Sequence, residues 1–312
     1  MFAAAGGIRP WGSPMFIAFR AEAPTWAALT TCYALFGLLT LAAPGAQTWL
    51  VYPGLALVLA FHSSLQHEAI HGHPTRWPLV NEALVALPLS FAYPYRRYRE
   101  THLAHHRDAR LTDPYDDPES WYLDPEDYEK RPAWMKALLK ANNAALGRML
   151  IGPGLGFVNF VIAEARLIRA GRRDVMLGWA LHALGAAPLL LWLGWCGVSP
   201  LGYALACYGG LALISLRSFL EHRAEERASE RSAIVEDRGP LALLYLNNNL
   251  HAVHHAHPEV SWHRLPALYA AHRERFRKLN GGYVFRSYAE VLSRHALKPK
   301  EPAAHPMMDR MR

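Results

Sequence analysis

Cysteine is nearly absent from the chain, which has only three in 312 residues. Cys32, Cys196 and Cys207 lie singly inside apolar stretches, and the sequence has no CxxC pair. This excludes a disulfide framework, and it also excludes zinc or redox chemistry built on paired thiols. The first twenty residues, MFAAAGGIRPWGSPMFIAFR, lack a continuous apolar core, so we do not expect a cleaved signal peptide.

Charge is missing from two long stretches, residues 24–66 and residues 175–216, which contain no Asp, Glu, Lys or Arg. A bilayer core of about 30 Å takes about 20 helical residues, so each stretch is long enough for two spans. Each has a break near its middle, at Pro44 in the first and at Pro200 in the second. The alternative is two buried hairpins of a soluble helical protein, but a helix of a soluble protein usually shows a polar stripe, and the absence of one here favours membrane spans.

Histidine, by contrast, is concentrated in three short clusters beside these apolar stretches. HEAIH has i, i+4 spacing, whereas HLAHH and HAVHH have i, i+3, i+4 spacing, so the rings of each cluster share one face of a helix. A neutral imidazole is a strong ligand for iron, zinc, copper or nickel, and eight of them exceed the needs of one ion. The expected ligands of two metal ions are His67, His71, His102, His105, His106, His251, His254 and His255. His222, at the end of the last apolar stretch, is a ninth candidate whose alternative role is that of a solvated interfacial histidine.

These patterns predict an all-α integral membrane protein with four transmembrane helices arranged as two hairpins. A cytoplasmic helical cap would carry the histidine-rich site for two metals, because arginines flank the outer ends of both hairpins and such ends face the cytoplasm. The apolar pieces at 77–95 and 150–163 are expected to be interfacial or re-entrant. The single domain would comprise a hairpin (24–66), a cytoplasmic or interfacial part (67–174), a hairpin (175–216), a cytoplasmic part (217–295) and a flexible tail (296–312).

The three clusters and their surroundings resemble the membrane fatty acid desaturase superfamily, whose members carry H(x)3–4H, HxxHH and HxxHH around a four-span bundle. LTDPYDDP, after the second cluster, is similar to the Asp-Pro-rich turn of that family. NNNLHAVHHAHPEVSWHRLP is similar to its Asn-rich approach and its closing Arg-Leu-Pro. The resemblance covers about residues 66–265. It implies that the nine candidate histidines hold two iron ions, and that the protein uses O2 and two electrons to oxidise an unactivated C–H bond of a lipid-like chain.

The donor set is consistent with this chemistry. Zinc prefers closed tetrahedral sites, whereas an all-imidazole site for two metals with open positions suits iron and O2. Metal-bound histidines usually donate the outer ring N–H to a nearby acceptor. The expected acceptors are the acidic residues beside the clusters, Glu68, Glu100, Asp108, Asp113 and Glu221.

The formal net charge of +7 suggests a partner of opposite charge. No zinc-finger or aromatic-basic module appears, so anionic lipid or an acidic protein is a better candidate than nucleic acid. No haem- or flavin-binding domain is evident, so electrons are expected from a separate carrier such as a ferredoxin or rubredoxin. The short first cluster is similar to that of bacterial members, which implies a bacterial inner membrane with the site facing the cytoplasm.

Several functions remain open at this stage. Desaturation of a fatty acyl chain is the first expectation, and a hydroxylase, a ketolase or an alkene-forming decarboxylase of the same superfamily is the alternative. A metal transporter is a remote alternative, because transport sites usually lie near the bilayer midplane and these histidines flank the spans. A protein without catalytic activity is disfavoured because all three clusters are complete.

Overall fold

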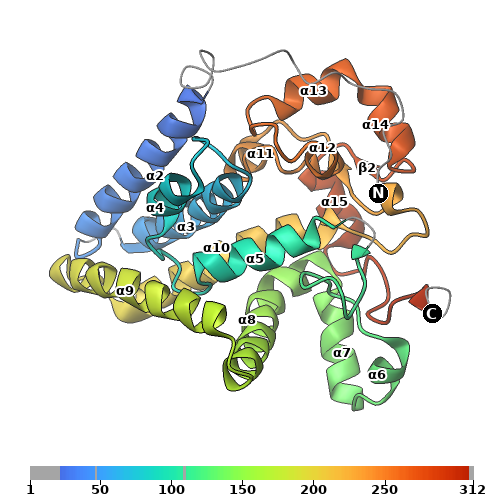
Figure 1. Ribbon diagram of the computed structural model, residues 1–312, viewed down its shortest axis with the longest axis horizontal. Helices are drawn as coiled ribbons and strands as arrows, with labels where there is room; N and C mark the ends of the chain where they lie inside the picture. Colours follow the sequence, from blue (N-terminus) through green and yellow to red (C-terminus); the bar gives the residue numbers. More distant parts are fainter. Residues whose placement is uncertain (1–21, 46–47, 108–109, 309–312) are drawn as a thin grey trace.

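The chain is almost entirely helical in this computed structural model, which describes residues 22–45, 48–107 and 110–308. This confirms the predicted all-α class, while the expectation on a signal peptide falls outside the described residues. The long helices are α2 (Ala23–Ala42), α3 (Thr48–Ile70), α8 (Ala145–Arg169), α9 (Arg173–Trp195) and α10 (Pro200–Glu221) (Figure 1). Shorter helices are α4 (Pro78–Val85), α5 (Tyr95–His105), α6 (Pro125–Glu129), α7 (Ala133–Asn142), η2 (Ala228–Glu230), α11 (Pro240–Leu244), α12 (His251–Ala256), α13 (Leu265–Ala271), α14 (Arg273–Leu279) and α15 (Tyr288–His295). Two short strands, β1 (Ile234–Val235) and β2 (Val284–Phe285), pair in parallel.

Both breaks in the apolar stretches end helices. α2 ends at Ala42, just before Pro44. α9 ends before Gly197, which adopts a positive φ of 67° that a glycine accepts at little cost. α10 then begins at Pro200, and the Ser199 hydroxyl accepts the Gly202 N–H at 3.3 Å. A serine cap followed by proline is a strong local signal for a helix start.

Four helices among the described residues are long and apolar enough to cross a membrane, namely α2, α8, α9 and α10. This set differs from the predicted one in two elements. α3 is absent from it, although it forms the second half of the predicted first hairpin, because the end of α3 carries the polar sequence HSSLQHE. α8 is present, although residues 150–163 were expected to be a short interfacial or re-entrant piece, because that piece lies within a continuous helix of 25 residues.

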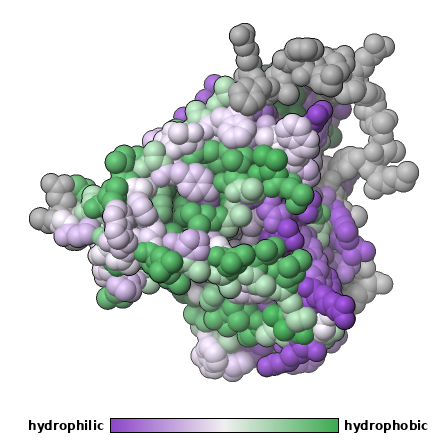
Figure 2. All heavy atoms as spheres, turned by 60° about the vertical axis from the view of Figure 1, so that its left-hand side comes forward, coloured by the Kyte–Doolittle hydropathy of each residue, from purple (hydrophilic) through white to green (hydrophobic). Residues whose placement is uncertain are grey.

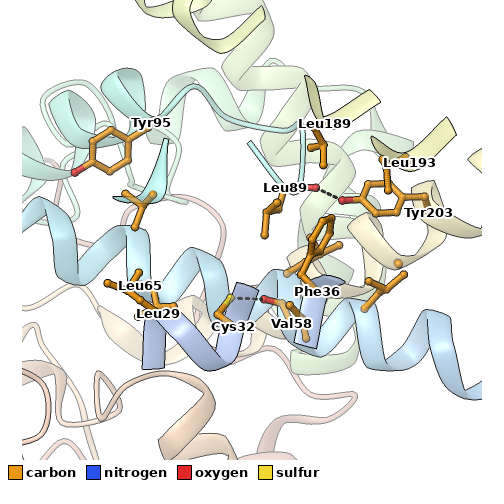
Figure 3. Close-up of a cluster of buried hydrophobic side chains, with 14 of the residues drawn as sticks. Leu29, Cys32, Phe36, Val58, Leu65, Leu89, Tyr95, Leu189, Leu193 and Tyr203 are labelled. Atoms are coloured by element: carbon orange, nitrogen blue, oxygen red, sulfur yellow. Dashed lines mark hydrogen bonds between the residues drawn. The ribbon is translucent and has the colours of Figure 1, made fainter. Parts of the chain in front are cut away.

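Helix α3 lies at the centre of the molecule, packed against α2, α4 and α10. α10 also packs on α8, whereas α9 packs on α5 and α8. Figure 3 shows the apolar core between these elements, where the Tyr203 hydroxyl on α10 donates to the carbonyl of Leu89 at 2.6 Å. The Cys32 thiol on α2 approaches the Val58 carbonyl on α3 at 3.8 Å. The end of α3 and the end of α10, which carry histidines, are therefore fixed relative to each other.

Large apolar side chains cover much of the outer surface of the long helices. Leu38 on α2, Leu191 on α9 and Leu201 on α10 are 64%, 76% and 71% exposed. Figure 2 shows that apolar residues dominate this face, while hydrophilic residues gather along one margin. Apolar patches of this extent are unusual on soluble monomers, and together with the candidate spans they indicate a membrane protein.

Residues 296–308, part of the segment expected to be a flexible tail, make contacts with the rest of the described chain. The Leu123 N–H donates to the Ala303 carbonyl, and the His305 N–H donates to the Leu123 carbonyl. His305 is only 2% exposed. The Lys300 ammonium donates to the carbonyl of His222 at 2.5 Å, so this segment borders the histidine clusters.

Candidate metal centre

The first histidine cluster extends from the end of α3. His67 lies in its last turn and His71 follows its last residue, Ile70. The i, i+4 spacing puts both rings on one face, with their centroids 4.9 Å apart. Helix packing around α3 therefore determines where this pair points.

The other two clusters lie on short helices whose starts are set locally. Pro94 precedes α5, which carries His102 and ends at His105, and His106 follows directly after it. The third cluster forms α12, which follows Leu246 and Asn247, both with positive φ. His222 follows α10 in an extended conformation and bridges to Ser232.

The structure brings all nine candidate histidines together in two adjacent groups. Within each group the potential ligand atoms lie within 4.8 Å of one another. The first group comprises His67, His71, His102, His106 and His254, and the second comprises His105, His222, His251 and His255. The ring of His106 in the first group stacks on that of His255 in the second, with centroids 4.2 Å apart.

The Nε2 atoms point into the two groups. In the first group, Nε2 of His102 lies 3.0 Å from Nε2 of both His71 and His106. In the second, Nε2 of His222 lies 2.9 Å from that of His105 and 3.0 Å from that of His251. Nε2 of His67 and His254 is buried without a hydrogen-bond partner in the described part of the chain. Buried nitrogen atoms of this kind are costly unless they are bound, so the donor set fits metal ions.

For four of these histidines, a hydrogen-bond acceptor outside the two groups lies beside the Nδ1 atom. Nδ1 of His102 lies 3.0 Å from the Glu119 carboxylate, and Nδ1 of His105 lies 2.8 Å from that of Asp117. Nδ1 of His251 lies 3.2 Å from the Asn248 amide oxygen, and Nδ1 of His222 lies 3.3 Å from the Ser232 hydroxyl. An Nδ1–H donated outward leaves the Nε2 lone pair free to bind a metal.

Among the carboxylates expected to accept an outer ring N–H, one lies beside a histidine ring of the two groups, and the other described ones have different partners. Glu221 comes within 3.5 Å of Nδ1 of His251. Glu68 instead accepts the Trp262 N–H, Glu100 pairs with arginines, and Asp113 accepts N–H groups of its own turn. Neighbours one or two positions away on a helix point to a different face, which explains why Glu68 and Glu100 miss the rings. Asp108 falls outside the described residues.

The acceptors that the structure reveals were missed in the sequence analysis. Asp117 and Glu119 lie in the acidic segment DPYDDPES, and Asn248 lies in the NNN run before the third cluster. Both segments lie in or next to the motifs that resemble the family, and this resemblance is the only sequence signal that could have indicated these acceptors. Nothing local indicates Ser232, because it reaches His222 through an antiparallel bridge across the loop of residues 223–231.

Burial controls the protonation of the rings. Burial, and then repulsion from neighbouring histidines, hold the pKa values of His251 and His254 well below the ordinary value. Such rings are neutral at physiological pH and can bind a metal without losing a proton first. Burial also lowers the pKa of His105, but the carboxylates of Glu119 and Asp117 outweigh it and raise that pKa to about 9.

Comparison with known proteins agrees with this geometry. A family model described as fatty acid desaturase matches residues 47–287, which is more than half of the chain. The chain belongs to the fatty acid desaturase family. This confirms the resemblance found in the histidine motifs, and membership indicates an oxidoreductase. None of the curated proteins compared with the chain matches it.

A cavity of about 650 Å³ adjoins the second histidine group of this desaturase-family protein. His105 and His222 line it, together with residues of α5, α8 and α10. Its apolar lining includes Phe160, Leu211 and Ile214. A cavity of this volume is of the usual size for a small-molecule site.

Proposed function

We propose that the protein oxidises an unactivated C–H bond of a fatty acyl or lipid-like chain with O2 at a di-iron centre, and that the reaction is a desaturation. The observation that carries the proposal is the convergence of nine histidines into two adjacent groups in a chain of this family. The apolar cavity beside the second group offers the space that such a chain needs. A hydroxylase, a ketolase or an alkene-forming decarboxylase remains the alternative, because each acts on the same kind of bond.

The two histidine groups are the proposed ligand sets. The first would hold one iron and the second the other, and when bound the pair would supply activation of O2. The protein itself fixes the rings. Asp117 and Glu119 accept the outer N–H groups of His105 and His102, and burial keeps most of the other rings neutral.

The same convergence constrains the path of the chain through a membrane. Three candidate spans, α8, α9 and α10, separate His105 from His222. If all three crossed, these histidines would lie on opposite sides, yet their Nε2 atoms are 2.9 Å apart. We therefore propose that α9 and α10 cross, and that α8, which contains Pro153 and the buried charges of Arg148 and Glu164, lies along the interface.

The first pair of crossings and the side of the membrane on which the histidines lie follow from this arrangement. Although α3 falls outside the set of four candidate spans, we propose α2 and α3 as the first pair of crossings, because the part of α3 before its polar end carries no Asp, Glu, Lys or Arg and packs on α2. All three clusters would then lie on the cytoplasmic side of a bacterial inner membrane. An even number of crossings then separates any two clusters.

Electrons would come from a separate acidic carrier of the ferredoxin or rubredoxin type. The positive net charge of the protein would attract this carrier, and high salt would slow the electron transfer.

Expression of the intact protein in a bacterial host, followed by mass spectrometry of its lipids and fatty acids, tests the proposal. The wild type should bind iron and yield chains that have lost a hydrogen pair. His255→Ala should lower iron affinity at least about tenfold and remove the product. His272→Ala is the matched control, because His272 lies at the end of α13, outside both groups, and should leave both readouts unchanged.

Two results would contradict the proposal. One is a lipid profile that does not differ between the wild type and His255→Ala. The other is flux of metal through the purified protein into liposomes, which would favour a transporter. Chains that gain oxygen or lose their carboxyl carbon would instead support the alternative reactions on the same centre.

A further inference from the structure

The cavity beside the second histidine group contains a buried arginine that has no carboxylate partner in the described part of the chain. Arg148 on α8 lines the cavity and is only 3% exposed. Its Nε donates to the Asn142 carbonyl at 3.0 Å, and its Nη2 donates to the Asn143 amide oxygen at 3.1 Å. Its Nη1 is buried and has no hydrogen-bond partner among the described residues.

Other buried arginines of the described chain are neutralised or fully bonded. Arg97 pairs with Glu164 at 2.8 Å. Arg217 also has a buried Nη1 without a hydrogen-bond partner among the described residues, but its charge is neutralised by Glu221 at 2.8 Å. The carboxylates that line the cavity have other partners: Glu301 is bonded to Tyr122 and to Lys300, and Asp117, Glu119, Glu164 and Glu221 contact a histidine or an arginine other than Arg148. A buried charge costs several kcal/mol unless it is paired, so Arg148 is poised for an anion from outside the chain.

The arginine side chain is held in place rather than free to swing towards solvent. The guanidinium carbon lies 3.9 Å from the ring centroid of Trp121. On the same helix, a Cβ at Gly152 would come within 2.7 Å of the Arg148 Cδ, and one at Gly156 would come within 3.3 Å of the Trp121 ring. Two glycines one helical turn apart thus leave the space that the stacked pair occupies.

We propose that this cavity binds its substrate as an unesterified acid, with the carboxylate at Arg148 and the apolar chain against Phe160, Leu211 and Ile214. The inference rests on the proposed function and names its substrate class. A planar guanidinium with an unused N–H matches a carboxylate, and charge-assisted bonds of this kind are strong. One unpaired cation suits one negative charge, which favours a carboxylate over a phosphate, since Lys300 is already paired with Glu301.

Equilibrium binding to the purified full-length protein in detergent tests this inference. Octanoic, dodecanoic and hexadecanoic acid are each compared with their methyl esters, which have the same chain but no charge. The wild type should bind at least one acid about tenfold more tightly than its ester, as expected for one charge-assisted hydrogen bond. Arg148→Gln should remove that preference without weakening ester binding, and Arg148→Lys should retain part of it.

The matched control is Arg166→Gln, which alters an exposed arginine of the same helix and should keep the preference for the acid. Equal binding of acid and ester by the wild type, or binding of neither, would overturn the inference, and this comparison needs no variant. A purely structural role for Arg148 would lower the unfolding temperature and weaken acid and ester alike. Iron content and product formation are measured separately, so a protein that oxidises chains without preferring acids would refute this inference and leave the proposed function intact.

Discussion

Within each HxxHH motif, the histidines divide between the two groups. The i, i+4 pair of the second cluster, His102 and His106, joins the first group, whereas His105 joins the second. The third cluster divides the other way, with His251 and His255 in the second group and His254 in the first. Residues four apart share a helical face, and the residue at i+3 is rotated away from it. Three histidines per motif thus tie two sites together through one short helix.

The effect of the Asp117 carboxylate on iron binding can be tested directly. It is buried, lies 2.8 Å from Nδ1 of His105 and also accepts the Thr112 N–H at 2.9 Å. Asp117→Asn should weaken iron binding about 10- to 100-fold, because partners of the outer ring nitrogen orient a ligand and raise its basicity. Iron titration of the metal-free protein measures the effect.

The neighbouring Asp116→Asn provides the matched control, because the Asp116 side chain is exposed and, among the described residues, forms an ion pair with Arg110 at 3.7 Å and none with a histidine. It should leave iron affinity unchanged. Equal losses in the two variants would show that the charge of the loop matters and that the contact with His105 does not.

Between helices, close packing of α3 and α10 determines where His67 and His222 stand. A Cβ at Gly210 on α10 would lie 3.0 Å from the Cβ of Leu59 and 3.1 Å from the Ala56 carbonyl on α3. Small residues at such positions allow helices in a membrane to approach closely. The histidines at the ends of both helices depend on this contact.

Gly210→Val should therefore destabilise the protein by about 1–3 kcal/mol, the usual cost of overpacking, and should lower its iron content. Gly194→Val is the control, since a Cβ at Gly194 on α9 would meet nothing within 4 Å. Thermal unfolding in detergent and iron analysis of both variants measure the difference. A similar fall for Gly194→Val would mean that valine in a helix, rather than the contact with α3, is responsible.

Across the whole molecule, the two histidine groups join segments from α3 to Lys300. The rings come from α3, α5 and α12 and from the residues that follow α3, α5 and α10, and Lys300 donates to the His222 carbonyl. A ligand that binds only the folded state stabilises it, by about 2.7 kcal/mol at a concentration one hundred times its dissociation constant.

Removal of iron with a chelator should consequently lower the unfolding temperature by several degrees, and the addition of Fe²⁺ should restore it. The His255→Ala variant should respond less to the chelator, because one of its proposed ligands is missing. An unfolding temperature insensitive to chelation in the iron-loaded wild type would show that the metal does not hold these segments together.

The sequence by itself determined the features that depend on local chemistry. Uncharged runs predict long apolar helices, Pro44 and Pro200 mark their breaks, and histidine spacing places rings on one helical face. The three motifs were also sufficient to indicate the family that the comparison then confirmed. Each of these signals operates within a few neighbouring residues, so a single chain reveals it.

Only the tertiary structure decided which residues meet across long distances in the chain. It divides the histidines into two groups. It places Asp117, Glu119, Asn248 and Ser232 beside the outer ring nitrogens, where Glu68, Glu100 and Asp113 were expected. It also joins residues 145–169 in one long helix, α8, packs Lys300 beside His222, and places Arg148 in the wall of a cavity. The physical reason is that helical periodicity fixes the direction of a side chain relative to its own helix, whereas its contacts depend on how distant helices pack.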